Sequence, residues 1–205
     1  MQLRDLALRF FGYLLLGAAI FQGVVVAAEA GYAAAMGMDD GPIEFAQLAL
    51  CLAAAAVLFA AGGRHPEHAV LLRIWGVLGI FAAGRELDYL SERLIAEHAY
   101  MVITGPALAS AGYLLATRWQ EVSRSVPELA GRSGVALLFA GFFIVVIYSQ
   151  LIGQKELWQA VMGEGWQRPV KDMVEETSEL LGYVLILLGS IELYVGAGSS
   201  NGESS

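Results

Sequence analysis

The apolar residues of this chain fall into blocks of about 20, the number a helix needs to cross a bilayer core roughly 30 Å thick. This spacing constrains the fold more than any other feature of the sequence. Six such blocks occur, and they cover residues 10–28, 43–61, 69–84, 98–117, 133–152 and 174–195. The sequence therefore predicts an all-α polytopic membrane protein, a bundle of six transmembrane helices.

The composition agrees with this prediction. Of the 205 residues, 57% are hydrophobic and only 16% are charged, whereas soluble domains carry about 25% charged residues. Because the six blocks use most of the chain, we expect a single transmembrane domain at 1–197 and a short disordered tail at 198–205. The net charge of −8 argues against a nucleic-acid partner, since nucleic acids select basic surfaces. The lipid bilayer is the expected partner.

The orientation follows from the positive charges, which are enriched in cytoplasmic loops. A cytoplasmic N-terminus places seven of the 12 Lys and Arg residues inside and five outside, and the loop at 30–42 carries none of them. An even number of spans then leaves both termini in the cytoplasm. The first apolar block is longer than the hydrophobic part of a typical secretory signal, so we expect a retained helix.

The acidic residues are distributed far less evenly. In this orientation 14 of the 20 Asp and Glu residues lie on the outer side; the other six are Asp5, Glu67, Glu121, Glu128, Glu192 and Glu203. Acidic residues contribute little to membrane orientation, so insertion does not explain the asymmetry. We expect the outer mouth of the bundle to carry a negative potential that attracts cations.

The last apolar block begins with the strongest acidic pattern. Asp172, Glu175, Glu176 and Glu179 follow one another at helical spacing, which places them on one stripe of a helix. Carboxylates are favoured in a first helical turn by the helix dipole, and this explains Asp172. Glu179 lies about ten residues into the helix, beyond the reach of that effect. It therefore calls for a different explanation.

The other helices bring polar side chains to the same outer layer. Ionisable groups at membrane depth are costly and usually face the bundle interior. A set of carboxylates with one imidazole suits Ca²⁺, Mg²⁺ or Mn²⁺, or else zinc or iron. We therefore predict a divalent metal ion as a possible cofactor. The candidate metal ligands are Glu29, Glu44, Glu86, Asp88, His98, Glu175 and Glu179, with Gln22, Gln47, Gln150 and Glu176 as supporting polar groups.

Simpler explanations compete with a shared site. Glu44 suits the first turn of a helix after Gly41. Glu86 can pair with Arg93, and Arg85 with Asp88, in salt bridges on a helix surface. Glu192 lies about 20 Å beyond Glu179 along the last helix; it is either an interfacial residue or a proton relay on the inner side.

Two short motifs carry a resemblance. R-E-L-D at 85–88 and E-E-T-S-E-L-L-G at 175–182 resemble segments shared by certain uncharacterised bacterial multi-span inner-membrane proteins. The resemblance extends over most of the chain and implies a multi-pass protein of the bacterial inner (cytoplasmic) membrane. It implies no activity. The chain does not resemble the CAAX-type intramembrane proteases, whose E-E-x-x-x-R motif would place Arg at position 180, where this chain has Leu180.

These features leave three functions open. The first is a metal-dependent membrane hydrolase that uses an outward-facing, carboxylate-rich cation site, for which the sequence identifies no catalytic residue. The second is a transporter or channel for a cation or a cationic solute. The third is a non-catalytic accessory or scaffold subunit whose charged face docks a membrane partner. A homo-oligomer is compatible with each of them.

Overall fold

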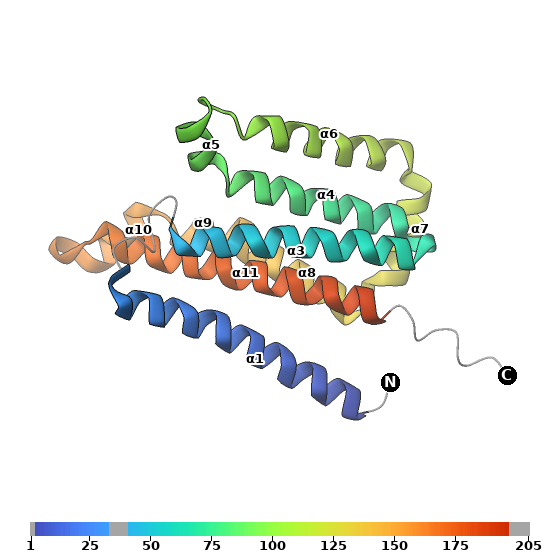
Figure 1. Ribbon diagram of the computed structural model, residues 1–205, viewed down its shortest axis with the longest axis horizontal. Coiled ribbons are helices and arrows are strands. Elements are labelled where there is room, and N and C mark those ends of the chain that lie inside the picture. Colours follow the sequence, from blue (N-terminus) through green and yellow to red (C-terminus); the bar gives the residue numbers. More distant parts are fainter. Residues whose placement is uncertain (1–2, 33–40, 197–205) are drawn as a thin grey trace.

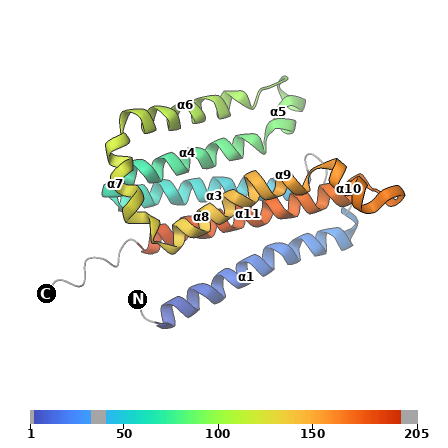
Figure 2. The same cartoon turned by 180° about the vertical axis from the view of Figure 1, so that it is seen from behind.

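The computed structural model describes residues 3–32 and 41–196, apart from the side chains of residues 3, 5, 6, 32, 89 and 90. Every regular element in these ranges is a helix. The long helices lie side by side and run back and forth along one direction (Figures 1 and 2). They are α1 (Leu3–Ala27), α3 (Pro42–Arg64), α4 (Ala69–Arg85), α6 (Met101–Thr117), α8 (Ser133–Phe143) with its continuation α9 (Ser149–Ile152), and α11 (Arg168–Gly196).

Shorter elements lie at the two ends of the bundle. Helices α5 (Asp88–Leu94) and α10 (Lys155–Met162) mark one end, here called the α10 end, and α7 (Trp119–Ala130) marks the other, the α7 end (Figure 1). The start of α1 and the end of α11 both lie at the α7 end. The remaining short elements are η1 (Ala28–Tyr32), η2 (Pro66–His68), η3 (Ile144–Tyr148) and η4 (Gly163–Gly165).

Glycine and proline set several helix boundaries. Gly31 interrupts the π-helical turn η1 with a φ of 95°, a conformation that glycine adopts without steric cost. Helix α3 begins at Pro42, whose missing N–H is not needed in a first turn. The same helix ends before His65, which precedes Pro66 and has a non-helical backbone, because a residue before proline avoids the helical region.

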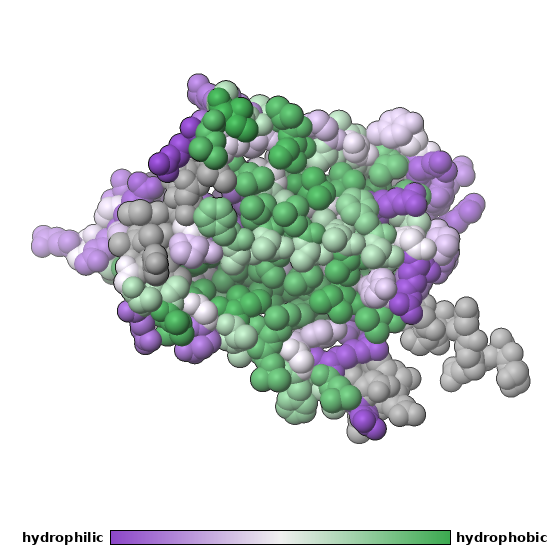
Figure 3. Space-filling view, in the orientation of Figure 1, coloured by the Kyte–Doolittle hydropathy of each residue, from purple (hydrophilic) through white to green (hydrophobic). Residues whose placement is uncertain are grey.

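Within residues 3–32 and 41–196, five helical segments are long and apolar enough to cross a membrane. A belt of hydrophobic side chains lies between two hydrophilic ends (Figure 3). The all-helical membrane fold is therefore confirmed at this level. Helix α6, which corresponds to the predicted span at 98–117, has only 17 residues and a length of about 25 Å. The five candidate spans in the described residues are Ala7–Gly31, Pro42–Arg64, Pro66–Arg85, Ser133–Ile152 and Arg168–Gly196.

Glycines allow α8 and α11 to approach each other closely. Gly141 lies opposite Gly182, and Gly134 lies opposite Gly189. A Cβ atom added at Gly141 would lie 2.5 Å from the carbonyl oxygen of Gly182, and one added at Gly134 would lie 2.8 Å from that of Gly189. Small residues at such crossings let membrane helices pack backbone to backbone. These two crossings hold α8 along the length of α11.

Helix α3 packs against both α4 and α11, and α6 packs against α4. The largest buried cluster lies toward the α7 end and includes Leu58, Leu72, Leu129, Val135 and Leu193. Helix α1 lies outside this core. Ile20, Phe21 and Val24 of α1 pack against Ile43 and Leu180, while most of its other side chains are exposed. The predicted tail at 198–205 lies outside the residues that the structure describes.

Candidate functional site

Near the α10 end, three helices bring four carboxylates together. Glu44 is in the first turn of α3, Glu86 directly follows α4, and Glu176 and Glu179 are in α11. Glu86 interacts electrostatically with Glu44, and Glu176 interacts with the other three carboxylates. All four are partly buried. We refer to these four residues as the acidic cluster.

Hydrogen bonds link the acidic cluster to the surrounding helices. The hydroxyl of Tyr183 donates to Oε1 of Glu86 at 2.6 Å. Nε2 of Gln47 donates to Oε2 and to the main-chain oxygen of Glu176, both at 3.0 Å. The hydroxyl of Ser149 is close enough to Glu179 to interact with it, although its proton is donated to the main-chain oxygen of Val145. An amide and the Tyr183 hydroxyl are thus the donors identified for two of the four carboxylates, and the charge of Arg85 acts on Glu86 and on Glu179.

Gln47 leaves one polar atom unsatisfied. The residue is 0% exposed, and its Oε1 atom has no hydrogen-bond partner within the described part of the chain. A buried acceptor without a donor costs on the order of 1–3 kcal/mol. The Nε2 atom of the same amide is already bonded to Glu176. A protonated carboxyl group, or an N–H group of a bound molecule, would supply the missing donor.

The protonation of Glu86 is shifted toward neutral pH. Burial raises the pKa of Glu86 to about 7, and the carboxylates of Glu44 and Asp88 act in the same direction. The hydrogen bond from Tyr183 and the charge of Arg85 oppose this increase in the pKa. Near pH 7 the Glu86 side chain therefore exchanges readily between its neutral and its charged form.

The raised pKa of Glu86 predicts a pH-dependent stability. An ordinary glutamate has a pKa of 4.5. The folded protein therefore loses stability through Glu86 as the pH rises from 4.5 to about 7. Gln at this position still accepts the bond from Tyr183 but cannot ionise. We expect Glu86→Gln to raise the free energy of unfolding at pH 8 by about 2 kcal/mol, with little change at pH 5, as measured by thermal unfolding in detergent.

The control for this measurement is Glu97→Gln, because Glu97 is 85% exposed near the same end of the bundle. We expect its melting temperature to follow that of the wild type at both pH values. A Glu86→Gln variant whose melting temperature differs from the wild type equally at pH 5 and pH 8 would contradict the assignment.

The N-terminal part of α11, from Arg168 to Glu175, is ion-paired instead of belonging to the acidic cluster. Asp172 accepts bonds from Arg168 and Lys171, both at 3.2 Å. Lys171 also pairs with Glu175, whose carboxylate lies against Gly153 at the end of α9. The acidic stripe expected from the sequence therefore divides into an ion-paired part, Asp172 and Glu175, and a cluster-forming part, Glu176 and Glu179.

Other predicted residues lie elsewhere. Glu29, Gln22 and Gln150 are exposed. His98 lies in the turn before α6, not at a helix start; its φ is 62° and its side chain is 58% exposed beside Glu92. Asp88 borders the acidic cluster through its electrostatic interaction with Glu86.

Two residues of the site were not predicted. Tyr183 follows Glu179 by four residues and so shares its helix face, a signal present in the sequence. Ser149 carries no such signal, because the π-helical turn η3 directly before it sets its direction. A π-helical turn rotates the helix face that follows it.

The metal-ion prediction gains no support from the geometry. Across residues 3–32 and 41–196 no group of three or more His, Cys, Asp or Glu side chains is arranged to hold a metal ion. The acidic cluster is therefore more dispersed than a coordination sphere. A divalent ion at the full predicted set of ligands stays a prediction.

Glu192, the possible inner relay, has structural partners at the α7 end. Its carboxylate forms an ion pair with Arg9 at 3.4 Å and accepts hydrogen bonds from Tyr13 at 2.5 Å and from Ser133 at 3.4 Å. The Glu192 side chain is 12% exposed. These contacts join α1 and α8 to α11.

No family model, no curated protein and no solved structure matches this chain. Function is therefore inferred from geometry and charge. The fold and the site together define a multi-helix membrane protein with a half-buried acidic cluster near one end of its bundle.

Proposed function

We propose that the protein spans the membrane six times, with both termini in the cytoplasm, and that its acidic cluster binds a cation on the outer side. The distribution of Lys and Arg supports this orientation, and α6 supplies the sixth span beside α4. The resemblance of residues 85–88 and 175–182 supports the bacterial inner membrane as the location.

The unsatisfied Oε1 atom of Gln47 beside Glu176 is the observation that carries this proposal. Around it, four carboxylates from three helices repel one another, and repulsion of this kind is strong where water is partly excluded. Uptake of positive charge relieves that repulsion. Carboxylate oxygens and an amide oxygen are all acceptors, so they suit a cation that donates hydrogen bonds, such as a protonated amine.

Among the three open functions, this geometry favours transport of a cation or a cationic solute. A zinc-type hydrolase needs a metal held by three protein ligands, and the acidic cluster is too dispersed to supply them. The scaffold function receives support only from the N-terminal part of α11, where Arg168 and Lys171 pair with Asp172 and Glu175.

The experiment compares thermal stabilisation by methylammonium and by tetramethylammonium at equal ionic strength. Both ions carry one positive charge, but only methylammonium donates N–H bonds. We expect methylammonium to stabilise the wild type by about 1.4 kcal/mol at ten times its dissociation constant, and tetramethylammonium to have no effect. The double variant Glu176→Gln/Glu179→Gln should respond to neither ion.

Two results would reject the amine site. One is an equal response of the wild type and the double variant to methylammonium. The other is stabilisation of the wild type by Ca²⁺ or Mg²⁺ and not by methylammonium, which would instead support the divalent-ion prediction.

A further inference from the structure

A cavity of about 350 Å³ opens at the α7 end, where the turn between α3 and α4 meets the junction of α6 and α7. Its lining combines apolar side chains with two guanidinium groups. Val70 and Leu114 supply apolar surface, and Arg73, Arg118 and Glu121 supply charge. The acidic cluster, near the opposite end of the bundle, contributes nothing to this cavity.

One of the two guanidinium groups is not neutralised. Arg118 donates to Oε1 of Glu121 at 2.8 Å, whereas Arg73 forms no ion pair or hydrogen bond with any residue described in the structure. Arg73 also lies within the apolar segment Pro66–Arg85. A charge inside a membrane helix is costly unless it reaches the interface or meets an opposite charge. The cavity therefore presents a guanidinium that lacks an anion.

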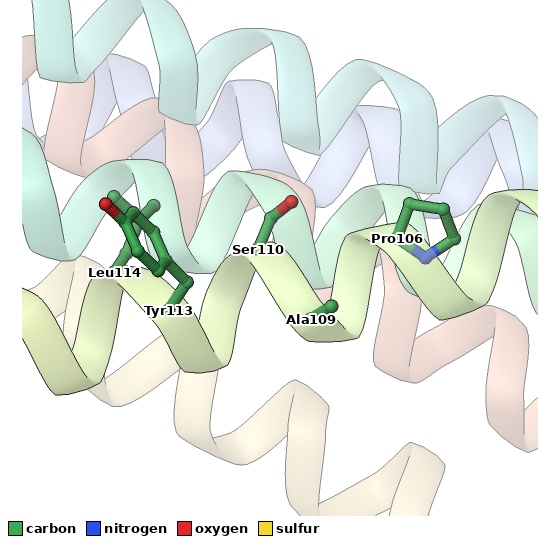
Figure 4. A pocket seen from close by; sticks show the side chains of 5 residues that line it. All are labelled: Pro106, Ala109, Ser110, Tyr113 and Leu114. Carbon is green, nitrogen blue, oxygen red and sulfur yellow. The ribbon is translucent and has the colours of Figure 1, made fainter.

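An open, shallow groove on the surface of α6 adjoins this cavity. Pro106, Ala109, Ser110, Tyr113 and Leu114 line the groove, and Leu114 also lines the cavity. Figure 4 shows these side chains following one another along α6. From Leu114 to Pro106 the helix rises about 12 Å. A narrow apolar surface thus extends from the arginine cavity toward the middle of the bundle.

We propose that this cavity and the adjoining groove along α6 together bind an anionic phospholipid, with its phosphate on Arg73 and Arg118 and one acyl chain along α6. Guanidinium groups match phosphate oxygens in charge and in geometry. Anionic lipids are abundant in the cytoplasmic leaflet, which the α7 end faces in the proposed orientation. A free phosphate ion would use the guanidinium groups alone, whereas a lipid also uses the apolar surface of α6.

The test measures retention of phosphatidylglycerol by native mass spectrometry of the full chain from mixed micelles, with phosphatidylcholine as the neutral competitor. We expect Arg73→Gln to lower the preference for phosphatidylglycerol about fivefold, the equivalent of about 1 kcal/mol for one basic residue at a membrane surface. Arg124→Gln is the matched control, because Arg124 is an exposed residue of α7 that lines neither the cavity nor the groove. It should retain the wild-type preference.

Two further measurements distinguish binding of a lipid from binding of a free phosphate ion. Ala109→Phe fills the surface along α6 at an exposed position, and we expect it to lower lipid retention while Arg73 is intact. Inorganic phosphate added to wild type in neutral detergent should not raise the melting temperature. Equal lipid retention by Arg73→Gln and Arg124→Gln, or stabilisation by inorganic phosphate, would overturn the inference. Neither result bears on cation binding at the acidic cluster.

Discussion

Replacing Gly141 by alanine should lower the free energy of unfolding by about 3 kcal/mol, near the upper range for overpacking a close contact. The added Cβ atom would lie 2.5 Å from the carbonyl oxygen of Gly182 and 2.7 Å from Cγ1 of Ile186. Backbone atoms cannot rotate out of the way, so α8 and α11 must separate. Thermal unfolding in detergent, followed by tryptophan fluorescence, measures the effect.

Gly112→Ala in α6 is the matched control, because a Cβ atom there meets nothing within 4 Å. We expect that change to leave the melting temperature unchanged or slightly higher, since alanine favours helix over glycine. The double variant Gly141→Ala/Gly182→Ala should lose less stability than the sum of the single variants, because both residues occupy one crossing. Equal losses from Gly141→Ala and Gly112→Ala would contradict the close crossing.

Replacing Glu192 by alanine should release α1 from the α7 end of the bundle. The change removes the ion pair with Arg9 and the hydrogen bonds from Tyr13 and Ser133. Breaking a fully buried ion pair costs about 3–5 kcal/mol. Because Arg9 is 26% exposed, we expect a loss of about 2 kcal/mol.

Hydrogen exchange of the backbone amides of residues 9–20 measures the release of α1 directly. We expect faster exchange there in Glu192→Ala, and a smaller effect in Glu192→Gln, which still accepts the hydroxyl bonds. Exposed Arg4 provides the control variant Arg4→Ala, which should exchange as the wild type does. An unchanged exchange rate in Glu192→Ala would show that the apolar contacts of Ile20, Phe21 and Val24 suffice to hold α1.

The sequence predicts the helices well, because a membrane span leaves an uninterrupted apolar run. The prediction of 133–152 coincides with the spanning segment Ser133–Ile152. Its division by the π-helical turn η3 could not be predicted, since Ile144, Val145 and Val146 are equally compatible with an α-helix. The expected start at 98 is three residues before the observed start of α6, because a turn with a positive φ at His98 separates α5 from α6.

The sequence predicts how far along its helix each candidate site residue lies, but not toward which side of the helix its side chain points. Glu44 and Glu86 lie at helix ends and Glu176 and Glu179 about two to three turns into α11, so counting along each helix places them in one layer, and the structure brings them together. Gln22 was expected in the same layer, yet its side chain is exposed. Helix α1 is apolar on all sides, so its sequence does not indicate which face meets the bundle.

The most direct test of the cation site is calorimetric titration of methylammonium into the wild-type protein at pH 7, in two buffers with different ionisation enthalpies. Binding of an ammonium group requires charged carboxylates, and burial raises the pKa of Glu86 to about 7. We therefore expect saturable binding accompanied by proton release, and the loss of both in Glu176→Gln/Glu179→Gln. Absence of saturable heat in the wild type, or identical heats in the double variant, would contradict the proposed cation site.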